Sequence, residues 1–146
     1  MLALSRGSEL LFRVVFTSQA VSGAGWTALS VAEILGASER NNRRDEIGSI
    51  MLVHGGRVAQ MAEGTRGDLD RLLSRLSSDG RHRDLVLICD RPIIQRRLKE
   101  PMALCGLTAD EVEAALQGRP LDRMPAEELE RLLCACRPAE SAAEAA

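Results

Sequence analysis

Apolar residues divide the first half of the chain into strand-like and helix-like segments. A Val- and Phe-rich run over residues 11–18 predicts a buried strand. Apolar residues then recur at helical spacing, which predicts an amphipathic helix over residues 27–39. A second strand is expected over residues 47–53, a tight turn at Gly55-Gly56, and a returning strand over residues 57–62.

The pattern continues with a second helix and further extended segments. Leucines at helical spacing predict a helix over residues 68–78. The near-continuous apolar run over residues 85–89 predicts a buried strand, and residues 92–98 are expected to be extended and more exposed. The order β-α-β-β-α-β corresponds to an α+β, ferredoxin-like split βαβ mixed sheet with two helices on one face.

The character of the chain changes after residue 101. Thr108 and Glu111 have the spacing of a helix capping box, and Pro125 favours the start of another helix that runs to about residue 136. We therefore expect C-terminal helices beyond the sheet. The predicted organisation is a domain at 10–104, a helical appendage at 105–137 and a frayed tail at 138–146.

Composition excludes several classes of function. A chain of 146 residues fits one domain, and its net charge of -2 gives no electrostatic reason to bind nucleic acid or an anionic membrane. Aromatic residues make up 2%, too few for a base-stacking surface. No stretch approaches the roughly 18 apolar residues of a membrane span. The expectation is a cytoplasmic protein that contacts neither membrane nor nucleic acid.

The four cysteines do not follow a metal-binding pattern. Cys89 and Cys105 are isolated, and Cys134-Ala135-Cys136 lacks the two-residue spacer of zinc knuckles and redox pairs. Positions two apart on a helix point to different faces, so Cys134 and Cys136 are not expected to bridge. The prediction is that all the thiols are reduced and structural, with no metal bound.

Three polar motifs surround the predicted elements. They are the stretches 38–43 (Ser-Glu-Arg-Asn-Asn-Arg), 55–64 (Gly-Gly-Arg-Val-Ala-Gln-Met-Ala-Glu-Gly) and 79–82 (Asp-Gly-Arg-His). With the apolar run at 11–18, their order and spacing resemble a BLUF domain, the flavin-binding blue-light sensors. The resemblance covers residues 11–104, about two-thirds of the chain.

The resemblance implies FAD as cofactor, with its isoalloxazine ring between the two helices. Ile34 and Leu76 match the apolar pair that encloses the ring, and Asn42 and Gln60 match the amides at its polar edge. The remaining residues at flavin-contacting positions are Ser38, Asp79, Arg81 and His82. Five of these residues have an alternative interpretation: core packing for Ile34 and Leu76, a helix C-cap for Asn42, a solvent-facing strand position for Gln60, and a surface histidine for His82.

The photochemical position departs from the family pattern. In BLUF proteins a tyrosine gives an electron and a proton after blue light excites the flavin, and the neighbouring glutamine rearranges. Here the tyrosine position holds Phe16, and the sequence contains no tyrosine. Met102 is adjacent to the family's methionine position. Other departures are smaller or altered residues at Gly48-Ser49, Ala59, Ala62, Leu98, Pro101 and Ala103.

Two functions remain open. The first is a BLUF-like sensor that signals through protein–protein association, with impaired or altered photochemistry. The second is a flavin-free interaction module that retains the fold. In both cases the protein is expected to act by binding an unidentified protein partner or by forming a homo-oligomer. An enzyme is not expected, because the chain has no Gly-x-Ser-x-Gly, phosphate-binding loop or His-Glu-x-x-His motif.

Overall fold

A five-stranded mixed sheet forms the centre of the protein in a computed structural model, which describes residues 10–20, 38–78, 80 and 82–137. The strand order is β4-β1-β3-β2-β5. All pairs are antiparallel except β2 with β5. The strands are β1 (Leu11–Ala20), β2 (Gly48–His54), β3 (Arg57–Thr65), β4 (His82–Ile93) and β5 (Ala103–Leu104).

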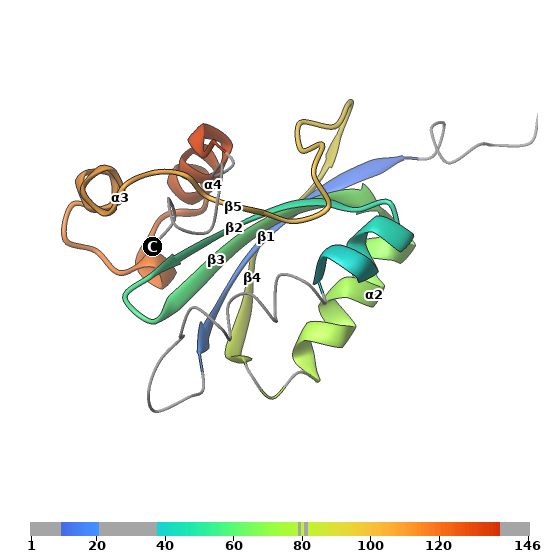
Figure 1. The fold of residues 1–146 in the computed structure, drawn as a ribbon, viewed down its shortest axis with the longest axis horizontal. Coiled ribbons are helices and arrows are strands. Elements are labelled where there is room, and N and C mark those ends of the chain that lie inside the picture. Colours follow the sequence, from blue (N-terminus) through green and yellow to red (C-terminus); the bar gives the residue numbers. More distant parts are fainter. Residues whose placement is uncertain (1–9, 21–37, 79, 81, 138–146) are drawn as a thin grey trace, which may run out of the picture.

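Helices cover both faces of this sheet (Figure 1). A helical segment over residues 38–44 and α2 (Arg66–Ser77) lie on one face. The other face carries α3 (Ala109–Leu116), the short 3₁₀ helix η2 (Leu121–Arg123) and α4 (Ala126–Ala135). The predicted α+β ferredoxin-like class with additional C-terminal helices is therefore confirmed. We call the first the α2 face and the second the α4 face.

Local sequence signals account for several element boundaries. Gly55 and Gly56 form the β2–β3 turn with φ of 60° and 77°, a left-handed conformation that glycine adopts without strain. Thr108 and Glu111 form the expected capping box of α3, and Pro125 precedes α4. The first predicted helix, 27–39, lies mostly outside the described residues. Residues 38–44 are helical, so helical structure is present beyond the predicted end.

Residues 85–89 form a strand as predicted, but the prediction that this strand is buried is wrong. This segment lies within β4, at the edge of the sheet, where Val86 and Leu87 are 49% and 47% exposed. An apolar run does not distinguish a central strand from an edge strand, because the strands and helices that cover it come from elsewhere in the chain. Only Pro92 and Ile93 of the expected extended segment belong to β4, and β5 was not predicted.

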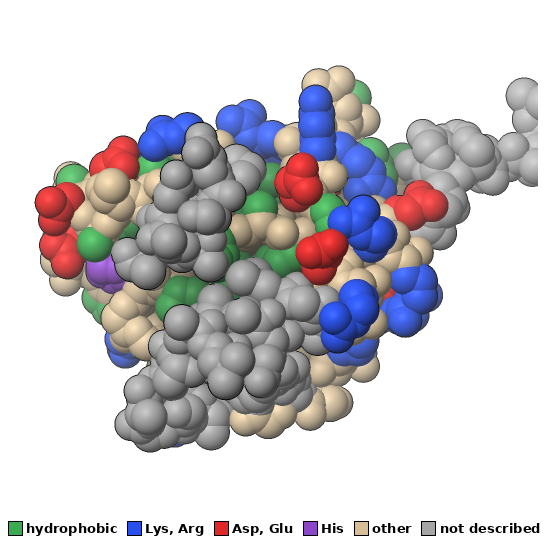
Figure 2. Space-filling view, viewed as in Figure 1, with side chains coloured by type: hydrophobic (Ala, Val, Ile, Leu, Met, Phe, Trp, Pro, Cys, Tyr) green, Lys and Arg blue, Asp and Glu red, His purple; other side chains and the backbone are tan. Residues whose placement is uncertain are grey.

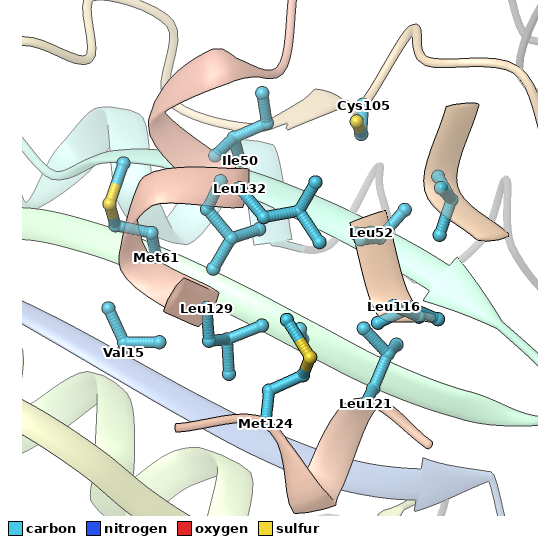
Figure 3. Packing of buried hydrophobic residues seen from close by; sticks show 13 residues of the cluster. Val15, Ile50, Leu52, Met61, Cys105, Leu116, Leu121, Met124, Leu129 and Leu132 are labelled. Carbon is cyan, nitrogen blue, oxygen red and sulfur yellow. The ribbon is translucent and has the colours of Figure 1, made fainter. Parts of the chain in front are cut away.

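Each face of the sheet has its own apolar core. On the α4 face, Val15, Ile50 and Met61 pack against helical leucines such as Leu129 and Leu132 (Figure 3). On the α2 face, the buried cluster comprises Val14, Phe16, Ile47, Ala62, Leu69 and Leu72. The C-terminal helices thus share a core with the sheet. The boundary between a domain at 10–104 and an appendage at 105–137 stays a prediction.

The expectation that all four thiols are reduced is wrong for one pair. Cys105 and Cys136 form a disulfide with 5.1 Å between their Cα atoms, whereas Cys89 and Cys134 are free. The two partners are 31 residues apart, and neither the i, i+2 geometry nor the motif spacing indicates that pairing. As expected, Cys134 and Cys136 do not bridge each other.

The described surface is mixed in charge. In Figure 2, Lys and Arg side chains lie among Asp and Glu side chains on the face shown. Within the described ranges, no group of His, Cys, Asp and Glu has the arrangement of a metal site. Among the helices that the structure describes, none has the length and apolarity needed to cross a membrane.

Candidate functional site

A row of buried side chains crosses the sheet on the α2 face. Phe16 of β1 pairs with Gln60 of β3, and Gln60 pairs with Met51 of β2. Residues directly opposite one another on antiparallel strands project from the same face, with Cβ atoms about 4.5–5.5 Å apart. Phe16 is 2% and Gln60 3% exposed. The structure therefore places the predicted photochemical position directly beside the predicted glutamine, and Gln60 does not face solvent.

Asn42 reaches the same face from the first helical segment. It is fully buried, and its Nδ2 donates to the carbonyl oxygen of Pro101 (2.7 Å) and to Ser49 Oγ (3.2 Å). Ser49 lies two residues before Met51 on β2, so it projects from the same face as the Gln60 row. Asn42 is inside a helical segment rather than at its C-cap, although its carbonyl accepts from the N–H of Ile47.

The other end of the Asn42 amide has no partner among the residues that the structure describes. Its Oδ1 is buried and accepts no hydrogen bond from any of the described residues. Buried polar atoms are nearly always paired, and an unpaired acceptor costs about 1–3 kcal/mol. Asn42 Oδ1 is therefore an acceptor suited to an N–H donor of a ligand.

The segment after β4 closes one side of this position. The Ser49 hydroxyl donates to the carbonyl oxygen of Pro101 (3.0 Å) and lies 3.4 Å from Met102 Sδ. A cavity of about 420 Å³ adjoins Asn42. Its lining includes the basic side chains of Arg43, Arg96 and Lys99, together with Glu46. Met102 is thereby linked to Asn42 through Ser49.

An ion pair connects the two helical elements of the α2 face. Asp45, just after the first segment, accepts from Arg75 Nη1 of α2 (3.1 Å) and from Arg44 Nε (3.0 Å). The hydrogen bond from Arg44 lowers the pKa of Asp45 below its ordinary value; partial burial opposes this, and Arg75 adds to the lowering. A charged Asp45 therefore helps to fix the spacing between the helices. On the exposed side of the first helical segment, Arg43 pairs with Glu39 at 2.8 Å.

The remaining predicted site residues divide into two groups. Leu76 is half-buried against the cluster that contains Phe16, and Ser38 is half-buried at the start of the described helical segment. Ile34, Asp79 and Arg81 lie outside the described residues, and His82 is described only as the first residue of β4. Contact of any of these residues with a cofactor stays a prediction.

Two alanines that depart from the family pattern lie on different faces. Ala62 belongs to the α2-face cluster with Phe16, whereas Ala59 belongs to the α4-face cluster. Because side chains alternate along a strand, Ala59 cannot share a face with its neighbour Gln60. Of these two alanines, only Ala62 affects the size of the site. The sequence alone could have separated them, because residues three apart on a strand project from opposite faces.

A buried charge pair lies behind the site, and sequence reasoning missed it. Glu63 of β3 is fully buried, and its Oε2 accepts from Arg13 Nε (2.8 Å) and Nη2 (2.6 Å). Its Oε1 accepts from the backbone N–H groups of Arg97 (2.7 Å) and Leu98 (2.8 Å). Glu63 thus anchors the segment that leads to Pro101, from the α4 face.

The same network reaches α4. Glu130 of α4 lies 3.4 Å from Arg13 Nη1 and 2.9 Å from Arg91 Nη2. Partial burial alone would raise the pKa of Glu130, but hydrogen bonds and charge from Arg91 and Arg13 outweigh it, so the pKa lies below its ordinary value. The period of two in a strand places Arg13 on the same face as Val15, but nothing local in the sequence indicates the partners of Arg13.

Comparison with known proteins agrees with this arrangement. The chain matches the family described as BLUF, sensors of blue-light using FAD, over residues 11–102. None of the curated proteins matches the chain.

Solved structures share the fold at low identity. BlsA in its photo-activated state is 16% identical with a TM-score of 0.78, and the match covers 90% of this chain and 99% of that one. BlrB, a BLUF protein in its dark state, is 26% identical with a TM-score of 0.71, covering 87% and 97%. Klebsiella pneumoniae BlrP1 with FMN and cyclic diGMP is 23% identical with a TM-score of 0.64, covering 86% of this chain and 35% of that one.

Proposed function

Because this chain belongs to the BLUF family of blue-light sensors, we propose that it holds FAD on the α2 face and lacks the family's light-induced red shift. The observation that carries the proposal is the direct pairing of Phe16 with Gln60 in a chain that contains no tyrosine. The position where a phenol would exchange a proton with the glutamine holds a ring without a hydroxyl.

The residues on this face fit an isoalloxazine ring. The unpartnered Asn42 Oδ1 suits the imide N–H of such a ring, and the buried Gln60 carboxamide offers both a donor and an acceptor. Leu76 and the predicted Ile34 would supply apolar contact on the two ring faces. When bound, the flavin absorbs blue light and becomes a strong electron acceptor.

Phe16 limits what the protein can do next. Its side chain packs in the apolar cluster of the α2 face and carries no ionisable proton. A hydroxyl at this position would have Gln60 as its hydrogen-bonding neighbour across the β1–β3 pair. Without it, the β1 residue directly opposite Gln60 offers the glutamine side chain neither a hydrogen bond nor a proton.

Output would occur through association with a protein partner or a second copy, without catalysis by the chain. The links from Asn42 to Pro101, and from Glu63 to residues 97–98, give the site a mechanical connection to the segment between β4 and β5. The flavin-free interaction module is the alternative, and the absorbance spectrum of the purified protein distinguishes them. Bound flavin gives a structured band in the blue, and an apo module gives none.

The decisive experiment compares light-minus-dark difference spectra of FAD-loaded wild type, Phe16→Tyr and Phe12→Tyr. Phe12 is the only other phenylalanine, and its β3 partner is Gly64 rather than Gln60, so Phe12→Tyr adds the same oxygen away from the glutamine. We expect a red shift in Phe16→Tyr alone. A red shift in the wild type would overturn the role given to Phe16. If Phe16→Tyr binds FAD but shows no red shift, the defect lies elsewhere in the pocket.

A further inference from the structure

We propose that the Cys105–Cys136 disulfide is a reversible clasp on the end of α4, opened at Cys136 by a small anionic thiol of the glutathione class. Both cysteines lie with the apolar cluster of the α4 face, across the sheet from the proposed flavin site. The bond joins the residue after β5 to the residue after α4, and the 31-residue separation encloses α3, η2 and α4. It therefore fastens the helical layer of the α4 face to the edge of the sheet.

The two sulfur-bearing residues differ in accessibility. Cys105 is 5% exposed and belongs to the apolar cluster of the α4 face (Figure 3), where its backbone N–H donates to the carbonyl of Met51 at 2.8 Å. Cys136 is half-buried and lines a cavity of about 400 Å³. A nucleophile that enters this cavity meets Cys136, and Cys105 is the sheltered leaving group.

The cavity walls suit an anionic thiol. Exposed Arg97, Lys99 and Glu100 lie in its lining, so cationic side chains exceed anionic ones by one. The free Cys134 also lines the cavity, with its backbone carbonyl accepting from Arg97 Nη2 at 3.0 Å. Thiolates are the reactive form in disulfide exchange, and nearby cations stabilise them. The carboxylates of a glutathione-class thiol are attracted by the same charges.

The exchange proceeds in two balanced steps. The incoming thiolate attacks Cys136 Sγ, the Cys105–Cys136 bond breaks, and Cys105 leaves as a thiolate that takes up a proton. A second thiolate then attacks the small-thiol sulfur of the mixed disulfide, which releases Cys136 as a thiolate that is protonated in turn. Two small thiols are oxidised to their disulfide as the protein disulfide is reduced to two thiols.

Opening the clasp affects the end of α4 more than its body. Leu129, Leu132 and Leu133 remain buried against the sheet and hold the helix in place. Beyond them, the described residues are held mainly by hydrogen bonds to the backbone: Arg97 Nη2 donates to the Cys134 carbonyl, Gly106 N–H to the Arg137 carbonyl at 2.5 Å, and Cys136 N–H to the Leu133 carbonyl. Reduction therefore loosens residues 134–137 and 105–107, while the sheet stays folded.

The test uses the full chain and glutathione. Oxidised protein should show two free thiols, Cys89 and Cys134, by maleimide labelling and intact mass, and four after reduction under native conditions. Brief treatment should trap a single adduct that peptide mapping assigns to Cys136. Cys89→Ser is the matched control and should leave the change of two thiols intact. Reduction that requires denaturation, or a glutathione adduct on Cys105 instead of Cys136, would overturn the proposal.

Hydrogen exchange then tests the consequence. Amides of residues 134–137 and 105–107 should exchange about tenfold or more faster in the reduced protein, while β1 and β3 keep their protection. Cys105→Ser should show the reduced pattern even under oxidising conditions. The proposal of a local clasp would be contradicted if amide exchange rates were identical in the oxidised and reduced proteins, or if reduction accelerated exchange evenly over the whole sheet.

Discussion

Replacing Glu63 with glutamine isolates the buried charge pair behind the site. The Glu63 carboxylate accepts four N–H groups, two from Arg13 and two from the backbone of residues 97 and 98. A glutamine of the same shape has only one acceptor oxygen, so its NH₂ group must face one of these donor pairs. Whichever way the amide turns, the guanidinium of Arg13, a residue only 8% exposed, would keep Glu130, at 3.4 Å, as its only carboxylate partner among the described residues.

The magnitude follows from this geometry. Breaking a buried pair by removing one charge costs about 3–5 kcal/mol, and the remaining contact to Glu130 favours the lower end, about 3 kcal/mol. Against a total stability of about 5–15 kcal/mol, this loss is large. With a urea m-value of about 2 kcal/mol/M, the midpoint of unfolding should fall by about 1.5 M.

Urea unfolding followed by far-UV circular dichroism measures the loss. Glu113→Gln, at an exposed position of α3, is the matched control and should stay within about 0.5 kcal/mol of wild type. In a double-mutant cycle, Arg13→Met with Glu63→Met should cost less than the two single changes summed, because neither charge is then left unpaired. A loss below about 1 kcal/mol for Glu63→Gln would refute the assignment of a strong buried pair.

Two further predictions concern the α2 face. Asn42→Ala should weaken FAD binding by about 1–3 kcal/mol, because the N–H of the flavin ring loses its acceptor. A flavin titration measures the affinity, with Asn41→Ala, at a half-buried neighbouring position, as the control. Unchanged affinity in Asn42→Ala would place the ring elsewhere. Asp45→Asn should cost about 1–2 kcal/mol at neutral pH. The pKa of Asp45 is lowered in the folded protein. The charged carboxylate therefore adds its full contribution to the free energy of unfolding above a pH of about 4, the ordinary carboxyl pKa, and this contribution disappears as the pH falls through the lowered pKa. Urea midpoints of both proteins should therefore converge on acidification, and a constant difference would contradict the ionic role.

Local signals were sufficient for much of the fold. The apolar run of β1, the Gly55-Gly56 turn and the Thr108 capping box are decided by neighbours within a few residues, and all three appear where the sequence predicts them. Phe16 and Gln60 were also identifiable from the motifs. Their adjacency depends on register, which the hairpin and the buried faces of β1 and β3 determine together.

Tertiary structure decided the features that join distant segments. The Arg13–Glu63 pair, the Asp45–Arg75 pair and the Cys105–Cys136 disulfide connect residues that are 50, 30 and 31 positions apart. The exposure of Val86 likewise depends on β4 being an edge strand. A side chain's type and periodicity determine which face it occupies, but its partner depends on which strands and helices are packed beside it. The sequence by itself therefore determined the elements and the candidate residues, and packing determined which of them meet.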